Sequence, residues 1–166
     1  MKEVAICPGS YDPVTSGHKD IFIRASKLYD KVIVAVAKNP RKAPFFPVDV
    51  RVMLLKKVIE PYPNIDVCHF DELLVDLAKK KKASVIVKGL RASSDFEYEF
   101  QMAQVNHKLA PEVETIFLVT KTDYAFLSSS AVKEVLRFNG CIENLIPPEI
   151  NNDLIRYYNQ YKKNRD

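Results

Sequence analysis

The chain has 166 residues, 47% of them hydrophobic, with three cysteines and a formal net charge of +4. This length and apolar content are enough to bury a core, which favours a single domain over residues 1–166. The cysteines form no Cys-x-x-Cys pair, no apolar stretch reaches the roughly 20 residues that cross a bilayer, and the charge is modest, so we expect a cytoplasmic protein without disulfides, zinc, membrane contact or a nucleic-acid partner.

Short apolar runs alternate with amphipathic segments along the chain. The runs predict strands at Val4 to Cys7, Val32 to Ala37, Ile65 to Phe70, Val85 to Val87 and Thr115 to Val119. Helices are predicted at Gly17 to Tyr29, Val48 to Glu60, Glu72 to Lys81, Asp95 to Leu109, Ser128 to Phe138 and residues 147–162, before a polar tail at 163–166. This alternation indicates an α/β fold of the Rossmann-like, dinucleotide-binding type, with a five-stranded parallel sheet flanked by helices.

The segment from Cys7 to His18 joins the first strand to the first helix. The chain has only four glycines, and two of them, Gly9 and Gly17, lie in this segment. Where glycine is scarce, it marks backbone that must bend or approach a ligand closely. An anion at the start of the helix would meet free backbone N–H groups, with the imidazole of His18 as a further donor. We interpret this loop as a phosphate-binding site.

Three further loops follow strands and therefore lie at the same edge of a parallel sheet. Lys38 to Phe46 is basic and can place a cation over a phosphate, although a solvated turn is the plainer interpretation. Lys88 to Arg91 sets two cations around a glycine at a strand end. Ser128 to Ser130 open a helix, where one serine is typical of an N-cap and three favour a polyphosphate site. Together the loops indicate a nucleotide.

A helix with acidic and aromatic residues follows Arg91, and its spacing places Asp95, Tyr98, Glu99 and Met102 on one face. Surface pairing or packing explains Tyr98 and Glu99 equally well. The chain contains neither a Gly-x-x-x-x-Gly-Lys-Ser/Thr loop nor a Gly-x-Gly-x-x-Gly string, which argues against a P-loop enzyme and a dinucleotide oxidoreductase. The other two histidines have no partners at the spacing of metal ligands, so no protein metal site is predicted.

Two motifs resemble the nucleotidylyltransferase superfamily. Thr15-Ser16-Gly17-His18 is similar to its Thr/His-x-Gly-His signature, and Leu127-Ser128-Ser129-Ser130 to its Ile-Ser-Ser-Ser motif. The longer strings resemble the bacterial phosphopantetheine adenylyltransferases over most of the chain; they are Pro8 to Pro13, Lys42, Lys88 to Arg91 and Asp95 to Glu99. This resemblance implies reversible transfer of the adenylyl group of ATP to 4'-phosphopantetheine, which gives dephospho-CoA and pyrophosphate in the penultimate step of coenzyme A biosynthesis.

The resemblance also implies site residues. As catalytic residues it implies His18, which would stabilise charge on the α-phosphate in the transition state, together with Lys42 and Arg91. The acceptor would be bound by Ser10, Lys42, Leu74 and Lys88. ATP would be bound by Gly9, Ser10, Tyr11, His18, Gly89, Leu90, Arg91, Glu99, Tyr124, Ala125, Phe126, Leu127, Ser128, Ser129 and Ser130. Magnesium would bridge ATP phosphates without an assigned protein ligand. A homohexamer and feedback binding of CoA are implied by the family alone.

The chain departs from the family pattern at a few positions. Lys88 stands where the family usually has arginine, which replaces a planar fork with a mobile point charge. Val50 stands where a glutamate is usual, and Tyr124 replaces a frequent tryptophan. The alternatives are another adenylyl- or cytidylyltransferase, such as a nicotinate mononucleotide adenylyltransferase, a non-catalytic nucleotide-binding regulator, and an RNA-binding protein that uses its lysines.

Overall fold

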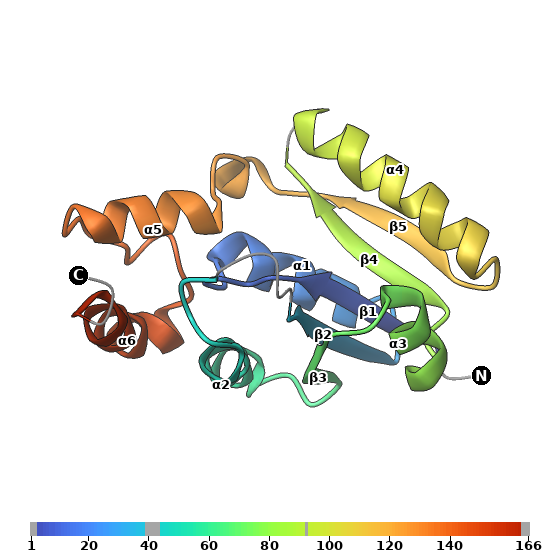
Figure 1. Ribbon diagram of the computed structural model, residues 1–166, viewed down its shortest axis with the longest axis horizontal. Coiled ribbons are helices and arrows are strands. Elements are labelled where there is room, and N and C mark those ends of the chain that lie inside the picture. Colours follow the sequence, from blue (N-terminus) through green and yellow to red (C-terminus); the bar gives the residue numbers. More distant parts are fainter. Residues whose placement is uncertain (1–2, 39–43, 92, 164–166) are drawn as a thin grey trace.

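A parallel sheet forms the centre of the computed structural model, which describes residues 3–38, 44–91 and 93–163. Its strand order is β3-β2-β1-β4-β5. The strands are β1 (Val4–Gly9), β2 (Lys31–Ala37), β3 (Ile65–Phe70), β4 (Val85–Leu90) and β5 (Glu114–Val119). All neighbouring strands in this order pair in parallel, so the predicted five-stranded parallel sheet is confirmed (Figure 1).

Helices connect the strands and cover both faces of the sheet. They are α1 (Ser16–Ser26), α2 (Val48–Ile59), α3 (Leu74–Lys81), α4 (Ser93–Leu109), α5 (Ser129–Arg137) and α6 (Asn151–Lys163), with short 3-10 helices at Thr122–Tyr124 and Pro148–Ile150. Each predicted helix is confirmed, with ends that shift by a few residues. The end of α1 was predicted at Tyr29. The helix stops earlier, at Ser26, where the chain tightens into a turn: the N–H groups of Lys27 and Leu28 donate to the carbonyls of Arg24 and Ala25, three residues back.

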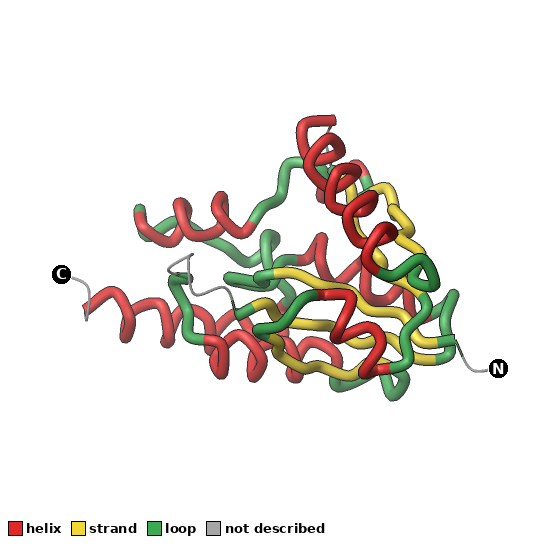
Figure 2. The backbone as a smooth tube through the Cα atoms, turned by 45° about the vertical axis from the view of Figure 1, so that its right-hand side comes forward, coloured by secondary structure: helices red, strands yellow, loops and turns green. Residues whose placement is uncertain are grey.

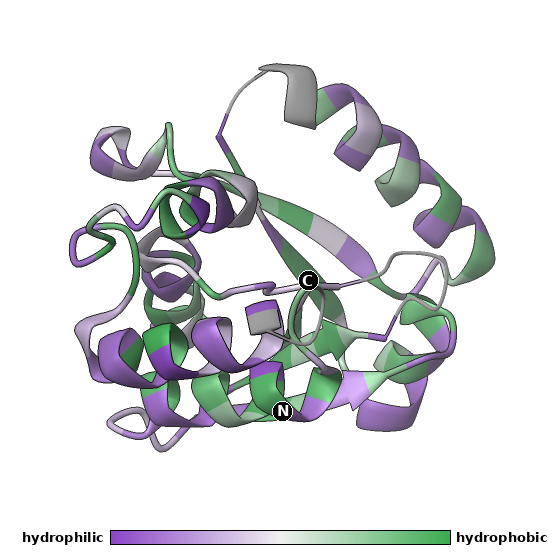
Figure 3. Ribbon diagram, turned by 60° about the vertical axis from the view of Figure 1, so that its left-hand side comes forward, coloured by the Kyte–Doolittle hydropathy of each residue, from purple (hydrophilic) through white to green (hydrophobic). Residues whose placement is uncertain are grey.

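The alternation of side chains along the strands divides the core into two layers. Ala5 of β1 packs with Phe22 of α1 and Leu54 of α2, whereas its neighbour Ile6 packs on the opposite face with Val75 of α3. Figure 3 shows the strands as mostly hydrophobic and the helices as mixtures of hydrophobic and hydrophilic residues. A parallel sheet buried on both faces accounts for the continuous apolar runs in the sequence.

The strands β1 and β4 separate towards their carboxyl ends. Register pairs join them at Ala5 and Ile6, whereas the pairing of β1 with β2 continues to Gly9. This separation lies where the strand order reverses, the position at which open α/β sheets bind ligands. The first strand was predicted to end at Cys7. It runs through Pro8, whose missing N–H is tolerated because β1 there pairs with β2 and, among the described residues, no longer with β4.

The C-terminal segments lie at the end of the molecule towards which β1 runs. Figures 1 and 2 place α5 and α6 together at this end. The N–H of Ser16 donates to the carbonyl of Leu145, with 3.1 Å between nitrogen and oxygen, and the ring of Phe45 stacks on Tyr158 of α6 at 4.9 Å between centroids. These contacts fix the start of α1 and the segment before α2 against the C-terminal region.

Candidate active site

Two cavities open where β1 and β4 separate. The first has a volume of about 350 Å³ and lies against α3 and α4, with Leu73, Leu74, Met102 and Asn106 in its wall. The second has a volume of about 420 Å³ and lies at the start of α1; its wall includes Thr15, His18, Gly89, Arg91 and Ser128 to Ser130. Both cavities are lined by Pro8, Gly9, Ser10, Lys88 and Glu99. Ligands in the two cavities would therefore meet at these shared residues.

The imidazole of His18 is fixed by the first turn of α1. Thr15 is the N-cap, and the N–H of His18 donates to Thr15 Oγ1 at 3.3 Å while the N–H of Thr15 donates to Nδ1 of His18 at 3.0 Å. This reciprocal pair is a capping box in which histidine takes the place of glutamate or glutamine. Because a backbone N–H can only donate, Nδ1 must accept. The neutral ring therefore carries its proton on Nε2.

The surroundings of His18 favour this neutral ring. Burial, together with the positive charges of Arg91 and Lys88, lowers its pKa from 6.5 to about 4. Tyr11 packs edge-on against the imidazole, with 5.1 Å between the ring centroids and 90° between the planes. At neutral pH, His18 thus offers an uncharged N–H donor to the second cavity.

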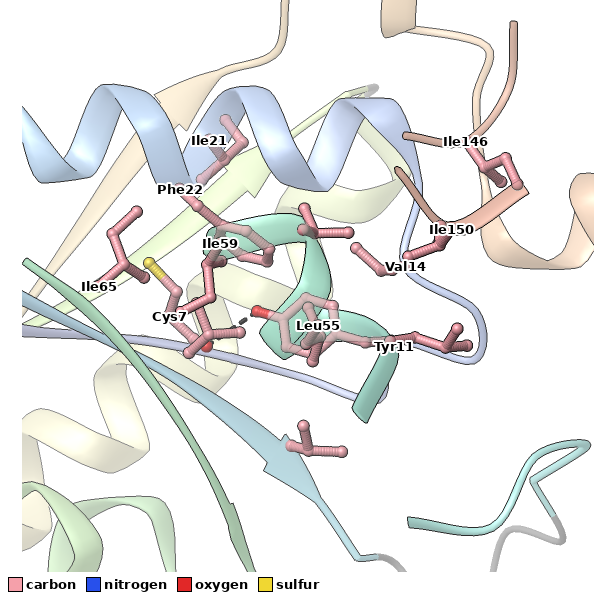
Figure 4. Close-up of a cluster of buried hydrophobic side chains, with 14 of the residues drawn as sticks. Cys7, Tyr11, Val14, Ile21, Phe22, Leu55, Ile59, Ile65, Ile146 and Ile150 are labelled. Carbon is pink, nitrogen blue, oxygen red and sulfur yellow. Dashed lines mark hydrogen bonds between the residues drawn. The ribbon is translucent and has the colours of Figure 1, made fainter. Parts of the chain in front are cut away.

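Tyr11 supports the loop that joins β1 to α1. Its backbone is left-handed, with a φ of 48°, and its buried hydroxyl donates to the carbonyl of Cys7 at 2.8 Å (Figure 4). A Cβ atom on Gly9 would lie 2.7 Å from Cζ of this ring. Gly9 is therefore needed for close approach, and the group that approaches it is the Tyr11 ring, whereas a bend or a ligand was predicted from the sequence. Cys7 is itself 2% exposed, and this burial raises the pKa of its thiol to about 12, so Cys7 acts as a small buried hydrophobe.

Charged side chains from β4 and α4 lie at the junction of the cavities. Lys88 Nζ lies 3.0 Å from Glu99 Oε2, and each side chain is about one fifth exposed, at 23% and 21%. Arg91 Nη1 donates to the carbonyl of Leu127 at 2.8 Å, which ties the end of β4 to the serine segment. The two cations predicted at Lys88 and Arg91 are thus accompanied by the carboxylate of Glu99, which balances part of their positive charge.

The serine segment combines a cap with a docking contact. Ser128 is the N-cap of α5 and accepts from the N–H of Ala131 at 3.0 Å, as the plainer interpretation of one serine predicted. Ser129 donates to the carbonyl of Pro13 at 2.7 Å. The start of α5 is thereby held against the loop that follows β1, with its serines in the wall of the second cavity.

Some predicted site residues do not line the cavities. Leu90, Tyr124, Ala125 and Phe126 do not belong to the described residues that line either cavity, and the side chain of Phe126 is 71% exposed. Contacts of these four residues with ATP stay predictions. Lys42 lies outside the described residues, so its role stays a prediction too.

Sequence reasoning missed three charged residues beside the site. Asp12 and Arg51 are buried at 5% and 2% exposure, and Lys133 of α5 forms an ion pair with Asp12 at 3.0 Å. Asp12 and Lys133 lie within or next to strings that carry the resemblance, but nothing in their spacing shows that they meet. Burial of a charge with its partners is a property of the tertiary structure, and a single sequence carries little signal for it.

Groups that could hold a metal were sought in the described part of the chain. Residues 3–38, 44–91 and 93–163 contain no cluster of three or more His, Cys, Asp or Glu side chains suited to a metal ion. Over the same ranges, no helix is both long and apolar enough to cross a bilayer. The three cysteines are free thiols.

Known proteins resemble this chain in sequence and in fold. A family model described as cytidylyltransferase-like matches residues 6–135. Phosphopantetheine adenylyltransferase from Alkaliphilus metalliredigens is 56% identical over 145 residues, which cover 87% of this chain and 92% of that protein. The enzyme of the same name from Caldanaerobacter subterraneus is 58% identical over 144 residues, with 87% and 90% covered. The structure of Plasmodium falciparum nicotinic acid mononucleotide adenylyltransferase complexed with NaAD matches at a TM-score of 0.73 over 98% of both chains; at 18% identity, that match shows the shared fold.

Proposed function

This chain belongs to the phosphopantetheine adenylyltransferases, a group within the cytidylyltransferase-like family, and it transfers the adenylyl group of ATP to 4'-phosphopantetheine; we propose that the transfer takes place where its two cavities meet. The products are dephospho-CoA and pyrophosphate, and the reaction is a step of coenzyme A biosynthesis. The observation that carries the proposed location is the set of residues common to both cavities, from Pro8 to Ser10 together with Lys88 and Glu99.

The second cavity suits ATP. It combines the start of α1, which directs backbone N–H groups at an anion, with Arg91 and the hydroxyls at the start of α5. The first cavity suits the pantetheine arm of the acceptor. Leu73, Leu74 and Met102 supply apolar contacts, and Asn106 supplies an amide for a polar group of the arm. Ser10 lies where the phosphates of the two substrates would come together.

The chemistry requires positioning and charge stabilisation. An oxygen of the acceptor phosphate attacks the α-phosphorus of ATP, the bond from that phosphorus to the bridging oxygen breaks, and pyrophosphate leaves with the electron pair. No protein nucleophile takes part, in keeping with transfers that depend on in-line geometry. His18 donates from Nε2 to a non-bridging oxygen of the α-phosphate, where negative charge must be held in the transition state.

Cations around His18 complete the proposed site. Lys88 exchanges part of its contact with Glu99 for the acceptor phosphate, and Arg91, held by Leu127, binds the phosphates of ATP. Lys42 has the same acceptor role by family resemblance. Because lysine binds phosphate as a point charge, Lys88 keeps the electrostatic contribution of the usual arginine with looser geometry.

Magnesium is proposed to enter with ATP. Such an ion is held mainly by phosphate oxygens and water, so no protein ligand is assigned to it. When bound, the ion neutralises charge on the phosphates. Arg91 and the serine hydroxyls would bind the same phosphates from the side of the protein. Removal of the ion with a chelator should abolish turnover, and added magnesium should restore it.

A homohexamer, feedback binding of CoA and a cytoplasmic location are carried over from the family or from the cysteine pattern as proposals. Exposed apolar side chains on α4 and β5 support burial between copies; they are Phe100, Leu109, Ile116 and Val119. Light scattering would measure the assembly. CoA shares the pantetheine arm of the acceptor, so we expect it to compete for the first cavity.

The identity of the acceptor is tested by product analysis. Purified protein is incubated with ATP, magnesium and either 4'-phosphopantetheine or nicotinate mononucleotide, and products are identified by mass spectrometry. We expect dephospho-CoA in the first mixture and no adenylylated product in the second. Preferential adenylylation of the mononucleotide would contradict the proposed acceptor site.

A further inference from the structure

Asp12 is a buried carboxylate in the loop after β1, next to Tyr11 in the wall of the second cavity, and it is not among the described residues that line either cavity. Its Oδ1 accepts from the N–H of Phe46 and its Oδ2 from the N–H of Phe45, each at 2.9 Å. The same Oδ2 lies 3.0 Å from Nζ of Lys133 on α5. One carboxylate thus joins the segment before α2 to the helix that carries the serines of the second cavity.

Arg51 of α2 also binds the segment before α2, the end of β2 and the residue that follows β1. Its Nη1 donates to the carbonyl of Ser10 at 2.6 Å and to that of Ala37 at 3.1 Å, and its Nε donates to the carbonyl of Phe46 at 3.0 Å. Burial lowers the pKa of Arg51, and the charge of Asp12 opposes that shift. Asp12 and Arg51 therefore both hold Phe46, and between them they fix the backbone from Ser10 onwards.

The helix α5 is attached to this loop at two points. The Ser129 hydroxyl donates to the Pro13 carbonyl at 2.7 Å, and Lys133, one turn later, reaches Asp12. The wall of the second cavity at α5 and the shared residue Ser10 are consequently linked through Asp12. A change in either contact would shift the serine segment relative to Ser10.

We propose that Lys133 and Asp12 form a positioning pair for the adenylyl transfer, which sets the α5 wall of the ATP cavity at a fixed distance from Ser10. This inference rests on the proposed location of the reaction. Asp12 is buried and Lys133 is 29% exposed, and such a partly buried ion pair adds little net stability because the charges lose hydration, so its contribution is to the geometry. In-line attack is sensitive to that geometry: a displacement of about 1 Å far from the chemistry can cost about 100-fold in rate.

The test is Lys133→Met in the full-length chain, with the turnover number, the Michaelis constants and the affinity for each substrate alone. We expect the turnover number to fall at least about tenfold, while calorimetric affinities for ATP and for the acceptor change by less than about threefold. Lys133→Arg keeps the charge and should recover most of the turnover. Lys31→Met is the matched control, since it breaks an exposed ion pair with Asp66 on β3 and should leave all parameters unchanged.

A second variant separates positioning from the effect of a lone buried charge. Asp12→Asn combined with Lys133→Met removes both charges, and we expect its turnover to stay low. The amide oxygen can accept from only one of the Phe45 and Phe46 N–H groups, so the melting temperature of the double variant should be lower than that of the wild type. Wild-type turnover in this double variant, or in Lys133→Met, would overturn the inference. The inference would also be overturned if Lys133→Met lowered the turnover number and lowered the affinities for ATP and for the acceptor by the same factor. Absence of turnover in the wild-type protein would instead contradict the proposed function.

Discussion

Replacement of His18 with glutamine separates its chemical role from its structural role. Glutamine at the third helical position can accept from the N–H of Thr15, as in the usual capping box, so the start of α1 should be preserved. The ring nitrogen that donates to the second cavity is lost. His18→Ala removes both the donor and the partner of the Thr15 N–H, and it therefore serves as the comparison.

The size of the effect follows from the number of contacts removed. Loss of one donor to charge that develops in the transition state typically costs about 100- to 1,000-fold in the turnover number, or about 3 kcal/mol. Arg91 and Lys88 remain beside the phosphates, so we expect the lower end of that range for His18→Gln. Loss of half the capping box in His18→Ala should cost a further ~1 kcal/mol of folding free energy, which the glutamine variant retains.

Pyrophosphate release under saturating ATP and 4'-phosphopantetheine measures the turnover number, and thermal unfolding measures stability. We expect His18→Gln to melt close to the wild type and to turn over about 100-fold more slowly, with ATP affinity changed by less than about threefold. A turnover number within about threefold of wild type would refute the role of His18 in the transition state. A large loss of ATP affinity at unchanged turnover would assign His18 to ground-state binding instead.

Three other predictions concern the same cleft. The lowered pKa of His18 means that protonation of its ring favours the unfolded chain. As the pH falls from 6.5 to about 4, the wild type should therefore lose up to about 1.4 kcal/mol of unfolding free energy per pH unit relative to His18→Gln. An unfolding free energy that changes equally with pH in both proteins would contradict this. Gly9→Ala places a Cβ atom 2.7 Å from the Tyr11 ring, and because that ring is buried we expect a lower melting temperature and reduced turnover; an unchanged protein would show that the ring can move. Lys88→Ala should raise the Michaelis constant for 4'-phosphopantetheine more than that for ATP. A Michaelis constant for 4'-phosphopantetheine that is unchanged from the wild type would remove Lys88 from the acceptor site.

The alternation of apolar runs and amphipathic segments was sufficient to predict the sheet and its helices. The predicted ends of β1 and α1 were wrong, because contacts in the folded chain determine where these elements stop. The strand β1 continues through Pro8 because β4 has separated from it, and α1 ends at Ser26 because the N–H groups of Lys27 and Leu28 bond to carbonyls three residues back. Neither event leaves a local signal in the sequence.

For the site, motifs predicted the loops but not the internal contacts that shape them. His18, Lys88 and the three serines were predicted, and the structure brings them to one cleft. The role of Thr15 in fixing the tautomer of His18 depends on a backbone direction that spacing does not give. The hydrogen bonds of Asp12 reach residues at least 33 positions away, and the bond from Arg51 to the Ser10 carbonyl spans 41 positions. Only the folded chain reveals such contacts.

The ionisation state of His18 is the central claim about the chemistry, and nitrogen nuclear magnetic resonance measures it directly. Long-range proton–nitrogen correlations of the imidazole, followed as a function of pH, report both the pKa and the tautomer. The structure predicts a neutral ring at pH 7, with the proton on Nε2 and a pKa of about 4. A positively charged ring at pH 7, or a neutral ring with its proton on Nδ1, would contradict the account.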